Sequence, residues 1–175
     1  NDIMSRGFVK EEDQEEAPII PPRAALPDGE INYVTPYGKQ ALLDEKTVLE
    51  QQRKDNDQTN ETERRRTNML IDGKLRLLQE RIESARVLDP KDQPKNEVRF
   101  GARVTFKNLS GPLKGKSMML QIVGVDEADV KKQKIAFVSP LAHAAMGKNE
   151  GAIFDLLLGA ETRKLEVLQI EYELA

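Results

Sequence analysis

Cysteine and tryptophan are absent from the 175 residues, and histidine occurs once, at position 143. The lack of cysteine excludes a disulfide framework, a thiolate metal site and cysteine catalysis. A single histidine also excludes a zinc site built from several histidines. No run of roughly 18 apolar residues occurs, and the N-terminus lacks the basic-then-apolar pattern of a signal peptide. We therefore expect a soluble, cytoplasmic protein.

Apolar and aromatic residues are scarce. Hydrophobic residues make up 38% of the chain and aromatic residues 5%, whereas charged residues make up 33%. A typical globular domain has about 45–50% apolar and about 25% charged residues. The chain has too little apolar material for one large core, so we expect an elongated helical part joined to a modest globular part. Because the net charge is only −3, any contact with nucleic acid has to come from a local basic patch.

Residues 1–34 are predicted to form an acidic, proline-rich arm. Acidic side chains dominate residues 11–16, and four prolines between residues 18 and 27 are incompatible with a regular helix. The apolar pair Ile19 and Ile20 could dock on a neighbouring part of the chain. The alternative is that the whole segment is a flexible arm.

Residues 35–88 are predicted to form an antiparallel α-helical coiled-coil hairpin. Thr35 followed by Pro36 is typical of a helix start, and Asn60 three residues before Glu63 is typical of a second one. The polar stretch between the helices favours a turn. Apolar residues of the second helix recur in steps of four and three, a heptad seam that needs a partner helix. These residues are Ile71, Leu75, Leu78, Ile82 and Ala85.

Residues 98–175 are predicted to form a small antiparallel β domain with one short helix, so that the fold class is α+β. Alternating apolar and polar runs, separated by glycines, predict the strands. The runs lie at residues 98–106, 120–125, 135–138 and 165–172. Ser139 followed by Pro140 predicts the start of the short helix, which ends before Gly147. Residues 131–134 are predicted to be a solvated hairpin turn.

Three segments of the C-terminal part carry a resemblance to known proteins. They are Val-Arg-Phe-Gly-Ala-Arg-Val at 98–104, Ile-Val-Gly-Val-Asp-Glu-Ala-Asp at 122–129 and Ser-Pro-Leu-Ala-His-Ala at 139–144. They resemble the C-terminal domain of the GreA/GreB family of bacterial transcript cleavage factors. Thr-Pro-Tyr-Gly at 35–38 and Ile-Asp-Gly-Lys-Leu at 71–75 resemble parts of the two helices of the family's coiled coil. The resemblance leaves the acidic arm uncovered.

The resemblance implies an FKBP-like fold for the C-terminal domain and a role at RNA polymerase. Members of the family insert the hairpin into the secondary channel of the polymerase, while the globular domain grips the channel rim. Acidic side chains at the hairpin tip help to hold a second Mg²⁺ in the polymerase active site, where a backtracked transcript is cleaved. By this resemblance the chain is not itself an enzyme, has no catalytic residues of its own and binds no cofactor stably, since the polymerase supplies the Mg²⁺. The implied partners are RNA polymerase and the 3′ segment of the nascent RNA; we expect a monomer that does not bind membranes.

The turn between the helices carries three candidate Mg²⁺ ligands, Asp57, Asp55 and Glu61. One or two carboxylates on a turn bind Mg²⁺ weakly, so such a tip has to complete the site of another protein. The family's Asp-x-Ser-Glu-Asn motif is not intact: one alignment places Asp57 at its Glu and another places Asp57 at its Asp. The alternative is that the aspartates are turn residues and that Glu61 stabilises the helix N-terminus through the helix dipole.

Arg64, Arg65 and Arg66 directly follow the turn and are candidate contacts to RNA or to the channel lining. Three positive charges in the first turns of a helix oppose its dipole, which indicates that something other than helix stability placed them there. The alternative is a solvated helix face.

A second candidate contact surface matches the segment with which the family binds polymerase. It comprises Ser139, Pro140, Leu141 and Ala142. His143, next in the sequence, is expected to be a surface or packing residue rather than a catalytic one.

The sequence therefore predicts a secondary-channel binding factor that stimulates cleavage of the backtracked transcript and rescues arrested elongation complexes. The alternative is a channel-binding regulator without cleavage activity, which blocks or competes with cleavage factors. An independent prolyl isomerase or chaperone rests on fold analogy alone.

Overall fold

The computed structural model describes residues 17–172. The acidic run at residues 11–16 therefore lies outside the described residues. Within them the chain divides into two compact units. The first comprises residues 17–23 and 44–80, and the second comprises residues 24–43 and 81–172.

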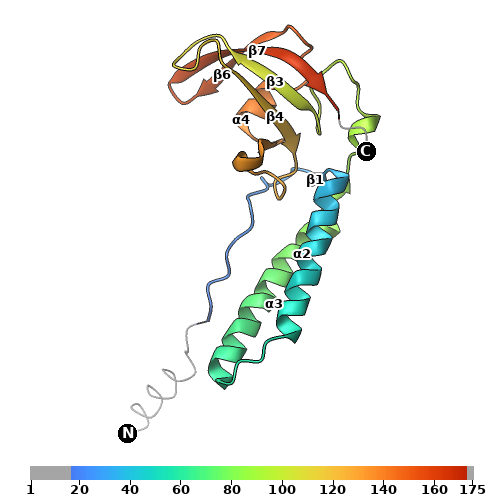
Figure 1. Ribbon diagram of the computed structural model, residues 1–175, viewed down its shortest axis with the longest axis vertical. Helices are drawn as coiled ribbons and strands as arrows, with labels where there is room; N and C mark the ends of the chain where they lie inside the picture. Colours follow the sequence, from blue (N-terminus) through green and yellow to red (C-terminus); the bar gives the residue numbers. More distant parts are fainter. Residues whose placement is uncertain (1–16, 173–175) are drawn as a thin grey trace. The chain divides into compact units, whose positions relative to one another are not determined.

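Two helices lie where the sequence predicts them, with residues 55–60 between them (Figure 1). Helix α2 spans Pro36–Lys54 and helix α3 spans Glu61–Ser84. The Oγ1 atom of Thr35 accepts a hydrogen bond from the Gly38 N–H at 2.9 Å, and Oδ1 of Asn60 accepts one from the Glu63 N–H at 3.1 Å. Both predicted N-caps are therefore confirmed.

The buried leucine and isoleucine side chains of the two helices keep the spacing of seven. Leu42 and Leu49 are buried in α2, and Ile71 and Leu78 are buried in α3. The rest of both helices is largely polar and exposed. Within the described residues, no helix is long and apolar enough to cross a bilayer.

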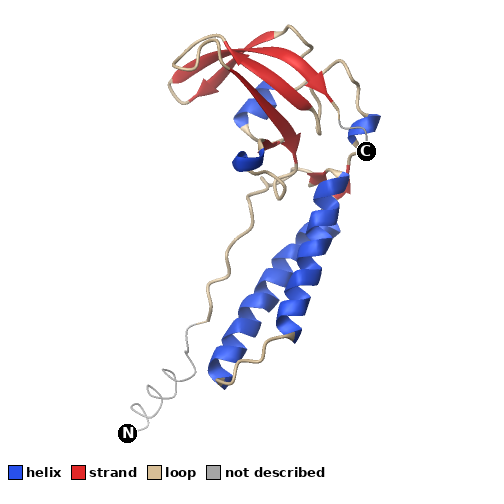
Figure 2. Cartoon of the chain, viewed as in Figure 1, coloured by secondary structure: helices blue, strands red, loops and turns tan. Residues whose placement is uncertain are grey.

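The second unit contains a five-stranded sheet, with helix α4 (Pro140–Ala145) lying against one face (Figure 2). The strand order is β5-β4-β3-β7-β6. The strands are β3 (Arg103–Asn108), β4 (Ser117–Val123), β5 (Lys134–Ala136), β6 (Ile153–Leu158) and β7 (Glu161–Glu171). The mixture of helices and sheet confirms the α+β class at this coarser level.

The prediction that all strands are antiparallel is wrong for β5, which pairs in parallel with β4. The chain leaves β4, crosses a loop that contains a turn of 3₁₀-helix at Val130–Lys132, and returns beside β4 in the same direction. Gln133 at the end of this turn has a φ of 58°, which redirects the chain into β5. Residues 130–133 do form an exposed turn, which is closed by the antiparallel bridge between Asp129 and Lys134. The predicted turn at residues 131–134 differs only at its end, because Lys134 already belongs to β5.

Strand β6 was not predicted, and the start of β3 was predicted too early. The residues of β6 do not alternate cleanly in polarity, and only Gly159 and Ala160 separate β6 from β7. Gly159 has a φ of 62°, a conformation that glycine adopts without steric cost. The predicted strand at residues 98–106 begins only at Arg103, because a turn with Gly101 at φ 89° precedes it.

The core of the second unit lies between the sheet and α4. Phe106 is fully buried and packs edge-to-face on Phe154, with ring centroids 6.0 Å apart. A second aromatic group comprises Tyr33, Phe100 and Phe137. Tyr33 belongs to β1 (Tyr33–Val34), which pairs in parallel with β2 (Arg86–Val87). The segments that flank the two helices are thus part of this unit.

Tyr172 fixes the segment that precedes β3. Its hydroxyl donates a hydrogen bond to the Glu97 carbonyl at 2.6 Å and accepts one from the Arg99 N–H at 2.9 Å. Burial raises the pKa of this hydroxyl above its ordinary value. The neutral phenol therefore joins the end of β7 to residues 97–99.

Replacing Tyr172 by Phe should lower the free energy of unfolding by about 1–2 kcal/mol, because two backbone groups lose their partner. Urea unfolding followed by circular dichroism measures this change. The matched control is Tyr37→Phe, since Tyr37 is exposed and should tolerate loss of its hydroxyl. An equal, small effect of both substitutions would contradict the role assigned to Tyr172.

Candidate functional site

The turn between α2 and α3 is fixed by neutral polar side chains. The Asn56 amide donates to the Arg64 carbonyl at 3.1 Å and to Oδ1 of Asn68 at 3.0 Å. Gln58 and Thr67 form a second link, with Nε2 of Gln58 donating to Oγ1 of Thr67 at 3.2 Å. These bonds join the turn to the first two turns of α3, so the turn presents its carboxylates from an ordered loop.

The three candidate metal ligands have different surroundings. Asp55 extends the hydrogen bonding of α2, and its carboxylate accepts bonds from Nε2 of Gln51 at 3.0 and 3.1 Å. Glu61 lies in the first turn of α3, where a negative charge favours the helix dipole. Asp57 is exposed and, within residues 17–172, forms no hydrogen bond or ion pair. Asp57 and Glu61 are therefore the two of the three carboxylates that are available to a partner, and Asp57 is the one that lies on the turn itself.

These side chains do not converge on a complete metal site. Within the described part of the chain, no group of three or more His, Asp or Glu side chains is placed to hold a metal ion. One or two carboxylates hold Mg²⁺ only together with ligands from elsewhere, since Mg²⁺ demands near-octahedral oxygen coordination. The arrangement can contribute one or two ligands to a site, but it cannot form the site alone.

An ion pair links the two helices close to the turn. Nε of Arg53 lies 2.7 Å from Oδ1 of Asp72, and Nη2 lies 3.2 Å from Oδ2. The hydrogen bond from Arg53 lowers the pKa of the Asp72 carboxyl below its ordinary value. Both side chains are about half exposed, so the pair contributes modestly to stability but fixes the register of the helices.

Arg64, Arg65 and Arg66 are all exposed on the first two turns of α3. They form a basic strip that begins three residues after the first residue of the helix. The strip lies in the same unit as the tip carboxylates and directly follows them in sequence. The structure thus places positive charge next to the candidate Mg²⁺ ligands.

The candidate contact at residues 139–142 is only partly accessible. Oγ of Ser139 caps α4 by accepting from the Ala142 N–H at 3.3 Å, and Pro140 is the first helical residue, both as predicted. Pro140 is exposed, and Leu141 is half-buried at the edge of the core. Ala142 is fully buried against the sheet and is withdrawn from the contact surface. His143 is exposed, as expected of a surface residue.

A charged network at the N-terminus of α2 was not predicted. Glu127 accepts hydrogen bonds from the Thr35 hydroxyl at 2.5 Å and from the Lys134 ammonium at 2.9 Å. The Lys134 ammonium also lies 4.2 Å from the centre of the Tyr37 ring. A Cβ atom on Gly38 would lie 2.7 Å from Oε1 of Glu127, so glycine is needed for the carboxylate to approach the helix.

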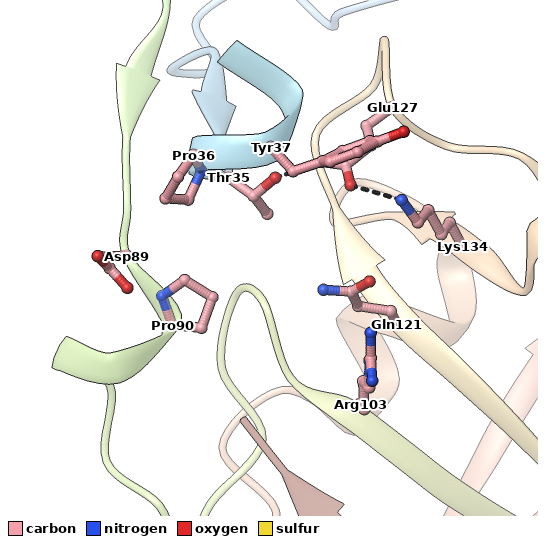
Figure 3. Close-up of a pocket in the computed structure, with 9 residues that line it drawn as sticks. All are labelled: Thr35, Pro36, Tyr37, Asp89, Pro90, Arg103, Gln121, Glu127 and Lys134. Carbon is pink, nitrogen blue, oxygen red and sulfur yellow. Dashed lines mark hydrogen bonds and ion pairs between the residues drawn. The ribbon is translucent and has the colours of Figure 1, made fainter. Parts of the chain in front are cut away.

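This network borders a cavity of about 290 Å³ (Figure 3). The amide of Gln121 and the rings of Pro36 and Pro90 face the cavity. Three of the charged side chains that line the cavity form ion pairs. Glu127 pairs with Lys134, and Oδ2 of Asp89 lies 3.5 Å from Nζ of Lys91. The remaining lining residues are Thr35, Tyr37 and Arg103. The Thr35 hydroxyl and the Glu127 carboxylate are in contact, but Thr35 caps α2 and Glu127 is paired with Lys134. The arrangement is therefore that of a structural joint.

The residues that sequence reasoning missed are therefore Asn56, Gln58 and Glu127. Their partners are Asn68, Thr67 and Thr35, and the last pair is 92 residues apart in sequence. The sequence offered one indication that Glu127 matters, since it lies in the segment at 122–129 that resembles the GreA/GreB family. The segment alone did not show which residue Glu127 binds.

Comparison with known proteins gives a consistent family. Residues 93–172 match the family model described as the C-terminal domain of the transcription elongation factors GreA/GreB. The GreB transcription elongation factor of Neisseria meningitidis is 32% identical over 157 residues, which cover 81% of this chain and 94% of that protein. The GreA factor of Hyphomonas neptunium is 36% identical over 103 residues, 59% of this chain and 64% of that protein. The match thus spans slightly less than two thirds of the length of the latter relative.

Two solved structures are also similar to this chain. The GreA/GreB factor of Nitrosomonas europaea has a TM-score of 0.39 at 17% identity and covers 80% of this chain and 98% of that one. GreA factor homolog 1 of Thermus thermophilus has a TM-score of 0.36 at 20% identity and covers 81% and 99%. On the family match and the Neisseria relative, the chain belongs to the GreA/GreB family of transcription elongation factors.

Replacing Glu127 by Gln should lower the free energy of unfolding by about 2–3 kcal/mol, because the Lys134 ammonium loses its carboxylate partner in a largely buried place. Urea unfolding at neutral pH measures the loss. The control is Glu30→Gln, since Glu30 is exposed in the same unit. If Glu127→Gln were as stable as the control, Glu127 would not hold the helix start.

Proposed function

We propose that this protein binds RNA polymerase in its secondary channel and stimulates cleavage of the backtracked transcript, so that arrested elongation resumes. The observation that carries the proposal is the exposed, unengaged carboxylate of Asp57 on an ordered turn between two helices. Membership of the GreA/GreB family supports RNA polymerase as the partner. A cytoplasmic location follows from this partner.

We also propose how the two parts of the fold act. The helices α2 and α3 would form a coiled-coil hairpin, which is supported by the spacing of seven between their buried leucine and isoleucine residues. The sheet with α4 against it would be the FKBP-like domain that grips the channel rim. A stiff pair of helices is suited to carrying a turn into a channel too narrow for a globular domain.

The tip would act by completing a metal site in the polymerase. Two metal ions about 3.5–4 Å apart stabilise the attacking and leaving oxygens when a phosphodiester is cleaved. Asp57, with Asp55 or Glu61, would supply oxygen ligands to the second Mg²⁺. The protein would then contribute ligands to the cleavage reaction without being an enzyme by itself.

The strip of Arg64, Arg65 and Arg66 would bind the displaced 3′ segment of the RNA. Its exposure and its place beside the turn support this role, since a basic surface tracks a phosphate backbone. Such contacts are electrostatic, and the contribution of the strip should therefore weaken as salt concentration rises.

The second candidate function is a channel-binding regulator without cleavage activity. Two observations favour it: Asp55 is already engaged by Gln51, and neutral side chains fix the turn. A tip of this kind would occupy the channel as a plug and exclude cleavage factors. A backtracked elongation complex distinguishes the two functions, because a plug would protect the transcript from an active cleavage factor.

Replacing Asp57 by Asn should reduce the rate of transcript cleavage at least about tenfold, because a neutral amide is a weaker Mg²⁺ ligand than a carboxylate. Binding to polymerase should stay within about threefold of the unchanged protein, because one exposed side chain adds little affinity. Cleavage is followed with a labelled transcript in a backtracked complex, and affinity is measured by competition.

The control for this substitution is Glu50→Gln, which removes one exposed carboxylate from α2 away from the turn. It should leave cleavage unchanged. Parallel loss of cleavage and affinity in Asp57→Asn would assign Asp57 to binding rather than to the metal.

Replacing Pro140 by Glu should weaken binding to polymerase at least about tenfold if the start of α4 contacts the channel rim. An acidic residue in the first turn of a helix is favourable, so the fold should be retained. His143→Glu, on the same helix, is the matched control, and Leu141→Arg is a second test with a check of folding. Unchanged affinity of a folded Pro140→Glu protein would remove this surface from the proposal.

A further inference from the structure

Ile20, which lies in the described part of the predicted arm, packs against α3. The side chain of Ile20 occupies the space above Gly73 so closely that a Cβ atom on Gly73 would fall 2.7 Å from Cγ1 and 3.3 Å from Cγ2 of Ile20. Gly73 is buried in the middle of α3. Ile20 is partly buried, whereas its neighbour Ile19 is 91% exposed. Of the two apolar residues singled out in the sequence, Ile20 is therefore the one that docks.

Gly73 is explained by this contact. Glycine in the interior of a helix is unfavourable relative to alanine, because the unfolded chain gains freedom and no side chain packs. Gly73 lies inside α3, far from both of its ends, so no turn or cap requires glycine at this position. The close approach of Ile20 gives a physical reason for a residue without a side chain at this position.

A second contact holds the same segment to α2. The Arg23 guanidinium donates two hydrogen bonds to the Glu45 carboxylate, at 2.6 and 3.1 Å, and only 18% of the Arg23 side chain is exposed. Pro21 and Pro22 lie between the two contacts, and proline restricts the backbone to extended conformations. Residues 20–23 thus form a short strap that is anchored to both helices.

The strap is seated where a channel-binding hairpin would have to be free. Gly73 lies twelve residues after the start of α3, and Glu45 lies nine residues before the end of α2. At the rise of an α-helix these positions are about 18 Å and about 14 Å from the turn. Insertion deeper than this would bring the strap, in addition to the two helices, into the channel.

We propose that residues 20–23 are a displaceable strap that limits how deeply the helices enter their partner, and that the seat formed by Gly73 and Glu45 is shared between the strap and the partner. This inference rests on the proposed binding of polymerase. The partly buried Ile20 and the partly exposed ion pair between Arg23 and Glu45 favour the seated state by a factor on the order of 10 to 100. A partner surface can therefore displace the strap. The strap therefore lowers affinity without abolishing it.

The experiment uses the absence of cysteine from the chain. In the variant Ile20→Cys/Gly73→Cys the two thiols are brought together, because a Cβ atom on Gly73 would lie 2.7 Å from Cγ1 and 3.3 Å from Cγ2 of Ile20. The sulfur of a cysteine at position 20 takes one of these γ positions, which is close enough to form a disulfide. Oxidation should therefore lock the strap on its seat, and reduction should release it. Disulfide formation is scored by mobility on a non-reducing gel. The matched control Ile19→Cys/Gly73→Cys should form little disulfide, since the Ile19 side chain is 91% exposed.

Affinity for the cognate RNA polymerase is then measured for the oxidised and the reduced protein. The oxidised form should bind at least about tenfold more weakly than the reduced form. The variant Ile20→Ala/Arg23→Ala, which cannot seat the strap, should bind roughly 10- to 100-fold more tightly than the unchanged protein, since the seated state no longer competes with the partner. A third reference is Ile19→Ala, which should have no effect.

The seat, its role in limiting insertion and the proposed function would each be contradicted by a different result. Absence of a disulfide in Ile20→Cys/Gly73→Cys would overturn the seat itself. A disulfide with equal affinity of the oxidised and reduced forms would leave the seat in place but overturn its role in limiting insertion. If neither the unchanged nor the reduced protein bound polymerase, the proposed function would fail, and with it the role of the strap.

Discussion

The carboxylate of Glu127 is the interaction on which the start of the helical part depends. It accepts a hydrogen bond from the Thr35 hydroxyl, which itself caps α2, and it pairs with Lys134 of β5. The cap, the first turn of the helix and an edge strand of the sheet are thereby joined through one side chain. Only 5% of the Glu127 side chain is exposed, so its charge is stabilised by these partners and by the N-terminal dipole of the helix rather than by water.

The tip of the helical part follows a different principle. Its turn is shaped by amide side chains, which satisfy backbone groups without adding charge, and its carboxylates are left on the outside. A fixed turn with an exposed carboxylate is suited to supplying a ligand to a metal held elsewhere, because little conformational freedom is lost on binding. The same turn would also serve as an inert plug, which is why the chemistry of Asp57 decides between the two proposed functions.

Local signals in the sequence predicted a large part of the fold. Thr35, Asn60 and Ser139 act through hydrogen bonds to residues three positions away, so their capping role could be inferred from spacing alone. Strand β6 was missed because its residues do not alternate in polarity, and the parallel pairing of β5 depends on a left-handed residue, Gln133, that has no composition signal.

The candidate site was predicted less completely, for a physical reason. The carboxylates of the turn were identified, but the amides that shape it, Asn56 and Gln58, find partners that propensity does not specify. Glu127 and Thr35 meet only because the sheet and the helix start fold together. Burial of Ala142 likewise depends on the docking of α4 on the sheet. Each of these contacts is set by tertiary packing, which pattern and spacing do not report.

The most direct measurement is the position of the turn in a complex with polymerase. Thr59 is exposed on the turn and, because the chain has no cysteine, Thr59→Cys accepts a photo-crosslinker at this single place. In a backtracked elongation complex, we expect crosslinks to the 3′ segment of the RNA or to the polymerase next to its catalytic Mg²⁺. Crosslinks confined to the outer surface of the polymerase would overturn the proposed function, because the turn would then never reach the site that it is proposed to complete.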